Sequence, residues 1–267
     1  MDLFSLKDKV AVVTGALGLL GKQHCFALSA AGASIVVCDL DEKKCDEFAK
    51  QLPVKSIGAA ADITNTVSVR KLRKKILKEF GRIDILVNNA AINDKFESPL
   101  AAKEFTRFEN YPIELWQKSL DVNLTGTFLC SQILGTEMAI RKTGSIINIA
   151  STYGIVAPDQ SLYKNENGEQ VFYKTASYPV TKGGVIAFTK FLASYWGEEG
   201  VRVNSLTPGG VENMQNDFFI KNYSQKTPLK RMAKPTDYIG ALVFLASDAS
   251  LYMTGANLVV DGGFTIC

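Results

Sequence analysis

Two side chains that together could move a proton stand four positions apart: Tyr178 and Lys182, in the stretch "YPVTK". Pro179 is tolerated only in a first helical turn, so we expect a helix to begin here and to place both on one face. A free tyrosine ionises near pH ~10, and an adjacent ammonium would lower its pKa toward that of a useful general base. A packed tyrosine at a helix start is the alternative. Tyr173, followed directly by Lys174, has no lysine four positions on, so we exclude that pair.

A glycine-rich turn near the N-terminus could hold a phosphate. The stretch "VVTGALGLLGKQ" places Gly15, Gly18 and Gly21 between an apolar segment and a helical one. Side chains there would block a pyrophosphate from the backbone, and the N–H groups at a helix N-terminus attract the anion. Asp39 ends the next apolar segment, where a carboxylate can accept the hydroxyls of an adenosine ribose and would repel a 2′-phosphate. Because Leu40 follows instead of an arginine, we expect NAD, with NADP disfavoured.

Other candidate cofactor-binding residues follow the ends of predicted strands. Asp62 and Ile63 come from "AADI", and Asn89 and Ala90 come from "NNAA"; these pairs could flank an adenine and a nicotinamide ribose. The rest of the candidate set is Leu20, Pro208, Gly209 and Val211, together with Tyr178 and Lys182.

Short apolar segments rich in β-branched residues alternate with segments of helical periodicity. The expected strands are residues 9–15, 34–39, 56–62, 83–90, 145–151, 201–209 and 257–263, and the expected helices are residues 18–31, 41–51, 65–80, 112–141, 178–198 and 235–246. This alternation is typical of βαβ units, and strands apolar along their length indicate a sheet buried on both faces. We therefore expect an α/β fold: one Rossmann-type domain over residues 1–267, a doubly wound parallel sheet of about seven strands with helices on both faces.

Composition narrows the possible functions. Of 267 residues, 46% are hydrophobic and 21% charged, and the net charge of +3 is too small to favour a nucleic-acid partner. No apolar run approaches the ~20 residues that cross a bilayer, so we expect no membrane partner. The five cysteines form no C-x-x-C pair, and the N-terminus does not suit a secretion signal, which favours a cytoplasmic protein. The single histidine, His24, lies away from other ligand types, so we expect no metal.

Two long polar segments interrupt the alternation of strands and helices. Residues 152–177 and 209–234 each follow the carboxyl end of a predicted strand, where open α/β sheets bind ligands. Loops of this length are usually functional or disordered. We interpret the first as an insertion between two candidate catalytic residues, and the second as a mobile substrate lid containing Phe218, Phe219 and Tyr223 at helical spacing. A buried aromatic stripe is the alternative for the second segment.

The insertion is rich in hydrogen-bonding side chains that could roof a substrate. They are Asp159, Gln160, Lys164, Asn165, Asn167 and Gln170. Such groups suit a sugar or polyol better than a steroid or a long acyl chain; a solvated surface loop is the alternative. Asn93, Asp94 and Lys95, after the fourth predicted strand, could also contribute.

Several short motifs follow one another along the chain in a specific order. They are "TGALGLLG" (14–21), "CDL" (38–40), "ADI" (61–63), "NNAA" (88–91), "DVNLTG" (121–126), "INIAS" (147–151), "YPVTK" (178–182), "VNSLTPGG" (203–210) and "MTGANLVVDGG" (253–263). With these motifs, nearly the whole chain resembles the short-chain dehydrogenase/reductase family. The resemblance implies a Rossmann-type domain, a nicotinamide cofactor and a homotetramer or homodimer.

The resemblance also implies roles for four residues. Tyr178 would be the general acid and base, Ser151 would hydrogen-bond the reacting oxygen, Lys182 would bind the nicotinamide ribose and favour the phenolate, and Asn123 would hold a water that connects to Lys182. A cationic nicotinamide would favour the phenolate further. The implied reaction interconverts a secondary alcohol and a ketone of a small-molecule substrate, with hydride passing to or from NAD.

The glycine-rich turn departs from the family's common pattern. The usual turn is T-G-x-x-x-G-x-G, but here the middle glycine is Gly18, and Leu19 stands one place later. That spacing is similar to the extended branch, which includes sugar-nucleotide epimerases, whereas the chain length and the "VDGG" ending favour the classical branch. Two alternatives stay open: a sugar or sugar-nucleotide epimerase or dehydratase that keeps its NAD bound, and a non-catalytic dinucleotide-binding sensor.

Overall fold

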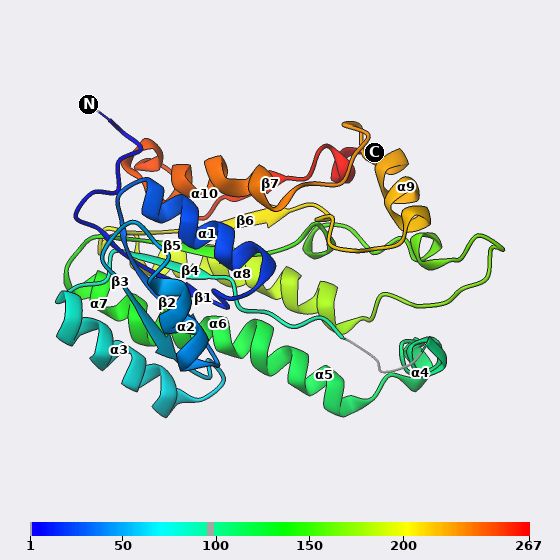
Figure 1. Ribbon diagram of the computed structural model, residues 1–267, viewed down its shortest axis with the longest axis horizontal. Coiled ribbons are helices and arrows are strands. Elements are labelled where there is room, and N and C mark those ends of the chain that lie inside the picture. The colour runs from blue at the N-terminus through cyan, green and yellow to red at the C-terminus, as the bar shows by residue number, and fades with distance from the viewer. Residues whose placement is uncertain (1, 95–98) are drawn as a thin grey trace.

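A parallel sheet organises the molecule in this computed structural model, which describes residues 2–94 and 99–267 (Figure 1). The strand order is β3-β2-β1-β4-β5-β6-β7. The strands are β1 (Val10–Thr14), β2 (Ser34–Asp39), β3 (Ser56–Ala60), β4 (Ile85–Asn88), β5 (Gly144–Ile149), β6 (Val201–Pro208) and β7 (Asn257–Val260). The predicted seven-stranded Rossmann-type sheet is confirmed. Its order reverses between β1 and β4, which is the crevice where such sheets bind ligands.

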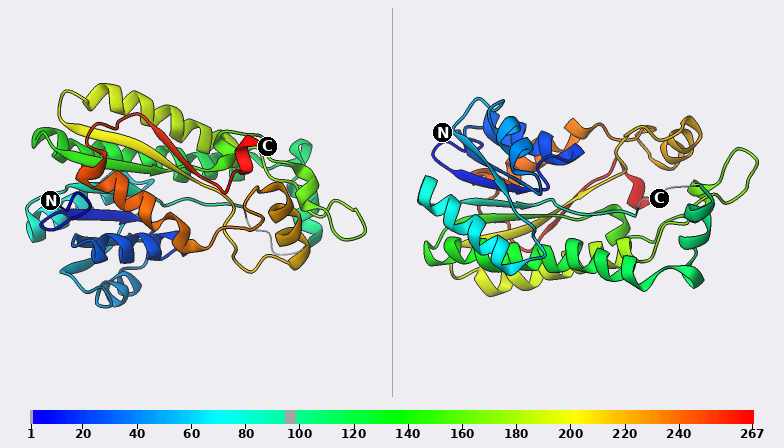
Figure 2. Two further views of the ribbon diagram at one scale, coloured as in Figure 1. Left: turned by 90° about the horizontal axis from the view of Figure 1, so that it is seen from above. Right: turned by 60° about the horizontal axis from the view of Figure 1, so that its bottom comes forward.

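Helices cover both faces of the sheet (Figure 2). On one face lie α1 (Leu19–Ala30), α2 (Glu42–Ala49) and α10 (Ile239–Ala246). On the other lie α3 (Thr66–Phe80), α6 (Gly126–Cys130), α7 (Thr136–Ile140) and α8 (Ser177–Trp196). The predicted helix over 112–141 is present as α5 (Ile113–Leu120), α6 and α7, joined by π-helical turns at Asp121–Thr125 and Ser131–Gly135.

Alternate residues of each strand supply the two hydrophobic cores. Val13 and Val37 pack toward α1, α2 and α10, whereas Val12 and Val36 pack toward α3, α7 and α8. Successive side chains of a strand point to opposite faces, so covering both faces requires strands that are apolar at every position. This is why the strands lack the polar alternation of a half-exposed sheet.

Two outlying segments lie beyond the carboxyl ends of the strands. Helix α9 (Asp217–Lys226) forms within the second long segment, and its Phe219 ring lies 5.6 Å from the Tyr163 ring of the insertion. An ion pair between Lys226 and Asp159 also joins the two segments. Helix α4 (Pro99–Phe105) was not among the predicted helices, although its "PLAAKEF" sequence starts with proline and continues with good helix formers.

Candidate active site

Tyr178 stands in the first turn of α8, and the predicted helix start is confirmed. Helix α8 begins at Ser177, whose hydroxyl lies 2.9 Å from the Tyr111 hydroxyl, and Pro179 occupies a position that needs no N–H donor. Tyr178 lines two neighbouring cavities of the described structure. It therefore stands where a molecule in one cavity can meet a molecule in the other.

Lys182 lies one helical turn beyond Tyr178 and is buried. Its Nζ donates a hydrogen bond to the carbonyl oxygen of Ile149 at 2.7 Å, at the end of β5, and lies 5.8 Å from the centroid of the Tyr178 ring. Burial disfavours the ammonium and lowers the pKa of Lys182 to about 8. The helical spacing thus places Lys182 beside the Tyr178 ring, as predicted. The carbonyl oxygen of Ile149 in β5 holds the ammonium there.

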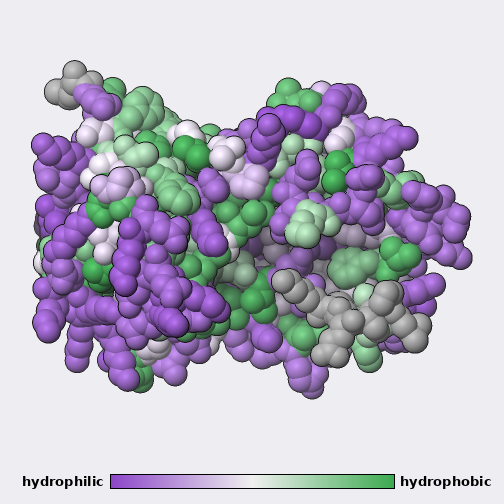
Figure 3. All heavy atoms as spheres, viewed as in Figure 1, coloured by the Kyte–Doolittle hydropathy of each residue, from purple (hydrophilic) through white to green (hydrophobic). Residues whose placement is uncertain are grey.

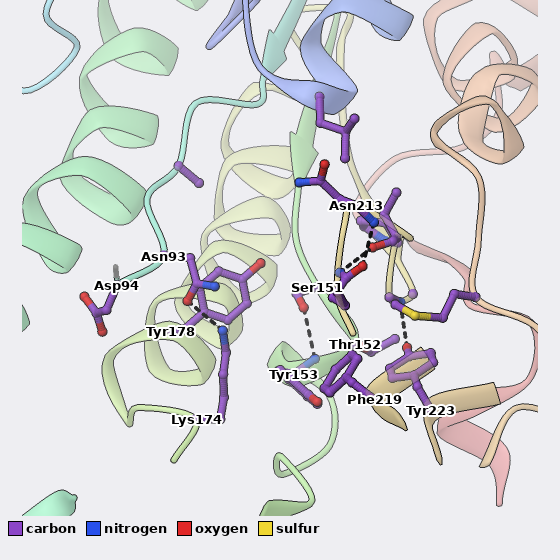
Figure 4. A pocket seen from close by; sticks show the side chains of 18 of the residues that line it. Asn93, Asp94, Ser151, Thr152, Tyr153, Lys174, Tyr178, Asn213, Phe219 and Tyr223 are labelled. Carbon is purple, nitrogen blue, oxygen red and sulfur yellow. Dashed lines mark hydrogen bonds between the residues drawn. The ribbon is translucent and has the colours of Figure 1, made fainter. Parts of the chain in front are cut away.

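Ser151 lies just beyond the end of β5 and faces the same ring. Its Oγ accepts a hydrogen bond from the Tyr153 N–H at 3.2 Å and so starts a short 3₁₀ turn (Figure 4). Burial raises the pKa of the Tyr178 phenol, while hydrogen bonding to Ser151 acts in the opposite direction. For the protein chain by itself, the predicted lowering of the Tyr178 pKa is therefore wrong, because the loss of hydration outweighs its neighbours.

Asn123 occupies the π-helical turn Asp121–Thr125 and is buried. Its Oδ1 accepts a hydrogen bond from the Ile92 N–H at 2.7 Å, and its Nδ2 donates to the Ile92 carbonyl oxygen at 3.0 Å and to Thr181 Oγ1 at 3.2 Å. The side chain thereby joins the segment after β4 to α8, next to Lys182. Its role in holding a water stays a prediction.

The glycine-rich turn passes close to the end of β4. Gly15 has a φ of +61°, and a Cβ there would lie 2.7 Å from the Cα of Ala90, while a Cβ on Gly21 would lie 2.1 Å from the Gly15 carbonyl oxygen. Gly18 is the N-cap of α1. Asn89 fixes the turn by donating from Nδ2 to the carbonyl oxygens of Thr14 and Gly15, at 3.0 and 2.9 Å. The turn leaves the N-terminus of α1 uncovered, as an anion site requires.

Asp39 and Asp62 stand at the ends of neighbouring strands. Asp39 accepts hydrogen bonds from the Leu17 N–H at 2.9 Å and the Leu40 N–H at 2.8 Å, so its carboxylate also shapes the glycine-rich turn. Asp62 accepts from the backbone and the hydroxyl of Thr64, at 2.9 and 2.7 Å. Both carboxylates line one cavity.

That cofactor cavity has a volume of about 580 Å³. Among the predicted residues its lining contains Gly15, Gly18, Leu20, Asp39, Asp62, Ile63, Asn89, Ala90, Tyr178, Lys182 and Pro208. Gly209 and Val211 instead line the neighbouring cavity, and Gly21 lies beneath the turn and lines neither. A tight turn with no room for a Cβ at Gly15 or Gly21, a carboxylate at one end of the cavity and a lysine at the other fit a bound dinucleotide.

The neighbouring cavity, here called the substrate cavity, is larger, at about 1070 Å³. The molecular surface is hollowed between the helices on the sheet and α9 (Figure 3). Aromatic rings of Tyr153, Tyr163, Phe172, Phe219 and Tyr223 form part of its lining. Its polar lining comes from Asn93, Asp94, Lys118, Ser151, Thr152, Lys174, Asn213, Gln215 and Asn216.

The prediction that the polar side chains of the insertion roof the substrate is wrong. None of the six predicted residues lines the substrate cavity. Asn165 bonds Glu169 within the loop, and Gln170 Nε2 donates to the carbonyl oxygens of Gln160 and Phe172. Asn165 and Gln170 thus bond within the insertion, whereas Asp159 pairs with Lys226 of α9. Asn93 and Asp94 do line the cavity, whereas Lys95 lies outside the described residues.

Lys174 is a cavity residue that the sequence did not reveal. It is 9% exposed and reaches the substrate cavity from the end of the insertion (Figure 4). Lys174 precedes Tyr178 by four positions, but helical spacing does not bring the two together, because α8 begins only at Ser177. The only available signal was its position in the long loop directly before the candidate catalytic tyrosine.

Three further observations concern membrane-spanning helices, metal sites and the single histidine. No helix in the described part of the chain is both long and apolar enough to span a membrane. Within residues 2–94 and 99–267, no three His, Cys, Asp or Glu side chains gather in a way that could hold a metal ion. His24 is buried in α1, and burial lowers its pKa to about 4.

Known proteins share both the sequence and the fold. Residues 15–265 match the family described as Enoyl-(Acyl carrier protein) reductase, and the motifs around Tyr178 lie within this span. The chain belongs to the short-chain dehydrogenase/reductase family. This family member is 31% identical to a NAD-dependent glycerol dehydrogenase of Listeria innocua, covering 98% of this chain and 96% of that protein.

Two further relatives extend the comparison. A D-threitol dehydrogenase of Mycolicibacterium smegmatis is 34% identical over 98% of this chain and 95% of its own length. The crystal structure of a gluconate 5-dehydrogenase of Burkholderia cenocepacia, in complex with NADP and tartrate, has a TM-score of 0.87 and 30% identity, covering 100% of this chain and 98% of that one. The protein is thus an oxidoreductase of the short-chain family that acts on CH–OH groups through a dinucleotide cofactor.

Proposed function

We propose that this protein is an NAD-dependent dehydrogenase that interconverts a secondary alcohol and a ketone on a small polyhydroxylated substrate. The observation that carries the proposal is the position of Tyr178 in the lining of both the cofactor cavity and the substrate cavity. A phenol at that junction can exchange a proton with a hydroxyl whose carbon faces the dinucleotide.

The chain's own groups supply the proton chemistry. In oxidation, Tyr178 takes the proton of the substrate hydroxyl, Ser151 hydrogen-bonds the same oxygen, and Lys182 provides positive charge beside the phenolate; in reduction the phenol returns the proton. Asn123 holds the segment after β4 against α8 and keeps this arrangement rigid. When bound, the nicotinamide accepts or donates the hydride at the reacting carbon.

The preference for NAD rests on Asp39. Its carboxylate lines the cofactor cavity at the end of β2, followed by Leu40, which is 74% exposed and offers no positive charge. A 2′-phosphate at this carboxylate would meet like charge with no arginine beside it. The glycerol dehydrogenase is named as NAD-dependent, whereas the gluconate 5-dehydrogenase was solved with NADP, so the family itself allows either cofactor.

The polyol character of the substrate rests on the substrate cavity. Its polar side chains approach from three loops, at Asn93, Thr152 and Asn213, and can hydrogen-bond several hydroxyls of one molecule. The named substrates of the relatives, glycerol, D-threitol and gluconate, belong to the same chemical class.

The decisive experiment is NADH formation from NAD with a panel of polyols, sugars, sugar acids and simple alcohols. We expect free NADH to accumulate with polyhydroxylated substrates, and Tyr178→Phe to lower turnover by about 10²-fold or more while NAD still binds. Epimerisation without free NADH would favour the cofactor-retaining alternative suggested by the glycine spacing. Turnover of long hydrophobic alcohols only would refute the polyol assignment.

We expect a homotetramer, or a homodimer, in the cytoplasm. Helix α8 exposes a row of aromatic rings: Phe191 is 61% and Tyr195 68% exposed, with ring centroids 5.9 Å apart. Exposed aromatic stripes of this kind favour association. Cys25, Cys38, Cys45 and Cys130 are buried free thiols, as suits a reducing compartment. Size-exclusion chromatography with light scattering measures the assembly.

A further inference from the structure

Lys174 brings a second ammonium group to the catalytic tyrosine, from the side of the substrate. Its Nζ lies 4.1 Å from the centroid of the Tyr178 ring, nearer than the 5.8 Å of Lys182. Lys182 lines the cofactor cavity, whereas Lys174 lines the substrate cavity. Figure 4 shows the Lys174 side chain directed toward the Tyr178 ring and the amide of Asn93.

The Lys174 ammonium makes one hydrogen bond to another described residue. Its Nζ donates a hydrogen bond to Asn93 Oδ1 at 2.6 Å, and an ammonium carries three donors. None of the ion pairs found among the described residues includes Lys174. Among the described residues, Asp94 is the acidic group that acts on the pKa of Lys174. The Oδ2 of that carboxylate already accepts hydrogen bonds from Tyr111 and Thr175, at 2.8 and 2.7 Å. Burial outweighs Asp94 and lowers the pKa of Lys174 to about 8, so the amine stays largely protonated near pH 7.

The insertion holds the backbone of Lys174 in place. Gln160 Oε1 accepts a hydrogen bond from the Lys174 N–H at 2.8 Å, and Gln160 Nε2 donates to the Lys174 carbonyl oxygen at 3.0 Å. Gln170 in turn donates to the Gln160 carbonyl oxygen at 2.8 Å. Polar side chains of the insertion that do not line the cavity thus hold in place a lysine that does.

Among the described residues Lys174 has no ion-pair partner, and an anionic ligand would offset the cost of burying its charge through a charge-assisted hydrogen bond. The Lys174 ammonium lies over the ring of Tyr178, close to the phenol hydroxyl of the same side chain. One small molecule can therefore contact both the ammonium and the hydroxyl. We propose that Lys174 selects substrates that carry an anionic oxygen group, a carboxylate or a phosphate, close to the reacting alcohol. This inference rests on the proposed function and specifies its substrates as acidic or phosphorylated polyols.

The kinetic test compares four-carbon substrates that differ in charge: threitol, threonate and erythritol 4-phosphate. We expect kcat/KM of the unaltered enzyme to be at least ~10-fold higher for threonate or for the phosphate than for threitol, as ~1.4 kcal/mol of binding gives tenfold. The better of the two identifies the anion. Lys174→Met should reduce this ratio to about one, chiefly by raising KM for the anionic substrate, and Lys174→Arg should keep most of it. Lys164→Met, on the exposed part of the same insertion, is the matched control and should change nothing.

A binding measurement separates this inference from the proposed function. Calorimetric titration of the NADH-saturated protein with tartrate and with threitol avoids turnover, because an alcohol and NADH cannot react with each other. We expect tartrate to bind more tightly, and Lys174→Met to remove the difference while thermal unfolding shows a folded protein. Equal binding of the two ligands would overturn the inference, even if polyol oxidation is found. Absence of any NAD-linked turnover would refute the proposed function alone. If Lys174→Met lowered the turnover of threitol and of threonate equally and shifted the pH profile, anion selection would be overturned. Lys174 would then act on the pKa of the Tyr178 phenol instead.

Discussion

Asp39→Asn tests how the protein chooses between NAD and NADP. The Asp39 carboxylate stands at the end of β2 and accepts hydrogen bonds from Leu17 and Leu40, at 2.9 and 2.8 Å. Asparagine has almost the same shape and keeps one acceptor oxygen, so the change removes the negative charge with little change in volume. NADPH should gain affinity and NADH should lose some.

The expected magnitude follows from the exposure of the site. Two unit charges about 4 Å apart interact by ~1 kcal/mol in water and ~4 kcal/mol near a protein surface. Asp39 is partly exposed, so we take the range ~1.5–3 kcal/mol, which corresponds to about 10- to 100-fold tighter NADPH binding. Replacing a charged acceptor by a neutral one costs NADH about 1 kcal/mol, or roughly fivefold.

Fluorescence titration with NADH and NADPH measures both affinities without knowledge of the substrate. Asp41→Asn is the matched control: it removes a carboxylate two positions away, and asparagine can still accept the Lys44 N–H bond, 3.1 Å long in the present protein, that caps α2. The reasoning is refuted if the unaltered protein binds NADPH as tightly as NADH, or if a folded Asp39→Asn protein shows an unchanged NADPH/NADH ratio.

Three further changes test the site. Tyr178→Phe should lower kcat by about 10²- to 10⁴-fold and leave NADH affinity within about threefold, measured by initial rates and titration. The pKa of Lys182 is lowered from 10.5 to about 8, so between these pH values the unfolded chain holds a proton that the folded chain has lost. The free energy of unfolding of the unaltered protein, measured by urea titration, should therefore rise relative to Lys182→Met by on the order of 3 kcal/mol from pH 8 to 10.5; an unchanged difference would contradict the assigned burial cost. Gly21→Ala, with its Cβ 2.1 Å from the Gly15 carbonyl oxygen, should lose NADH binding, whereas at Gly240 a Cβ meets no described atom within 4 Å, so Gly240→Ala should retain binding and gain up to ~1 kcal/mol of stability.

Hydrophobic periodicity predicted the sheet well because each strand is buried on both faces. All seven strands lie within the predicted ranges or within one residue of them, as at Gly144, where β5 starts. Periodicity did not reveal the π-helical turns within 112–141, because each spans only five residues in a stretch with apolar residues on more than one face. It also missed α4, a short helix whose few residues give a weak periodic signal.

The site was predictable where regular elements place it. The positions of Gly15, Asp39, Ser151 and Tyr178 follow from strand ends and from one helix start, so sequence order alone brings them to one edge of the sheet. The insertion has no such rule. Whether Gln160 or Lys174 faces the cavity depends on hydrogen bonds within an irregular loop. The amino-acid composition of the loop shows only that both residues are polar.

The electrostatics of Tyr178 explain why a dehydrogenase would gather lysines around it. Burial raises the pKa of the phenol, which suits a proton donor in ketone reduction but opposes its use as a base in alcohol oxidation. Positive charge must make up the difference, and the chain offers it from two sides, at Lys182 and Lys174. Lys182 donates a hydrogen bond to the Ile149 carbonyl oxygen and lines the cofactor cavity, so its position does not depend on the substrate. Lys174 faces the substrate, so an anion bound there would neutralise part of its charge and leave Lys182 as the main cation at the phenol. We therefore propose that the two lysines have different roles: Lys182 sets the proton affinity of the Tyr178 phenol, and Lys174 recognises the substrate.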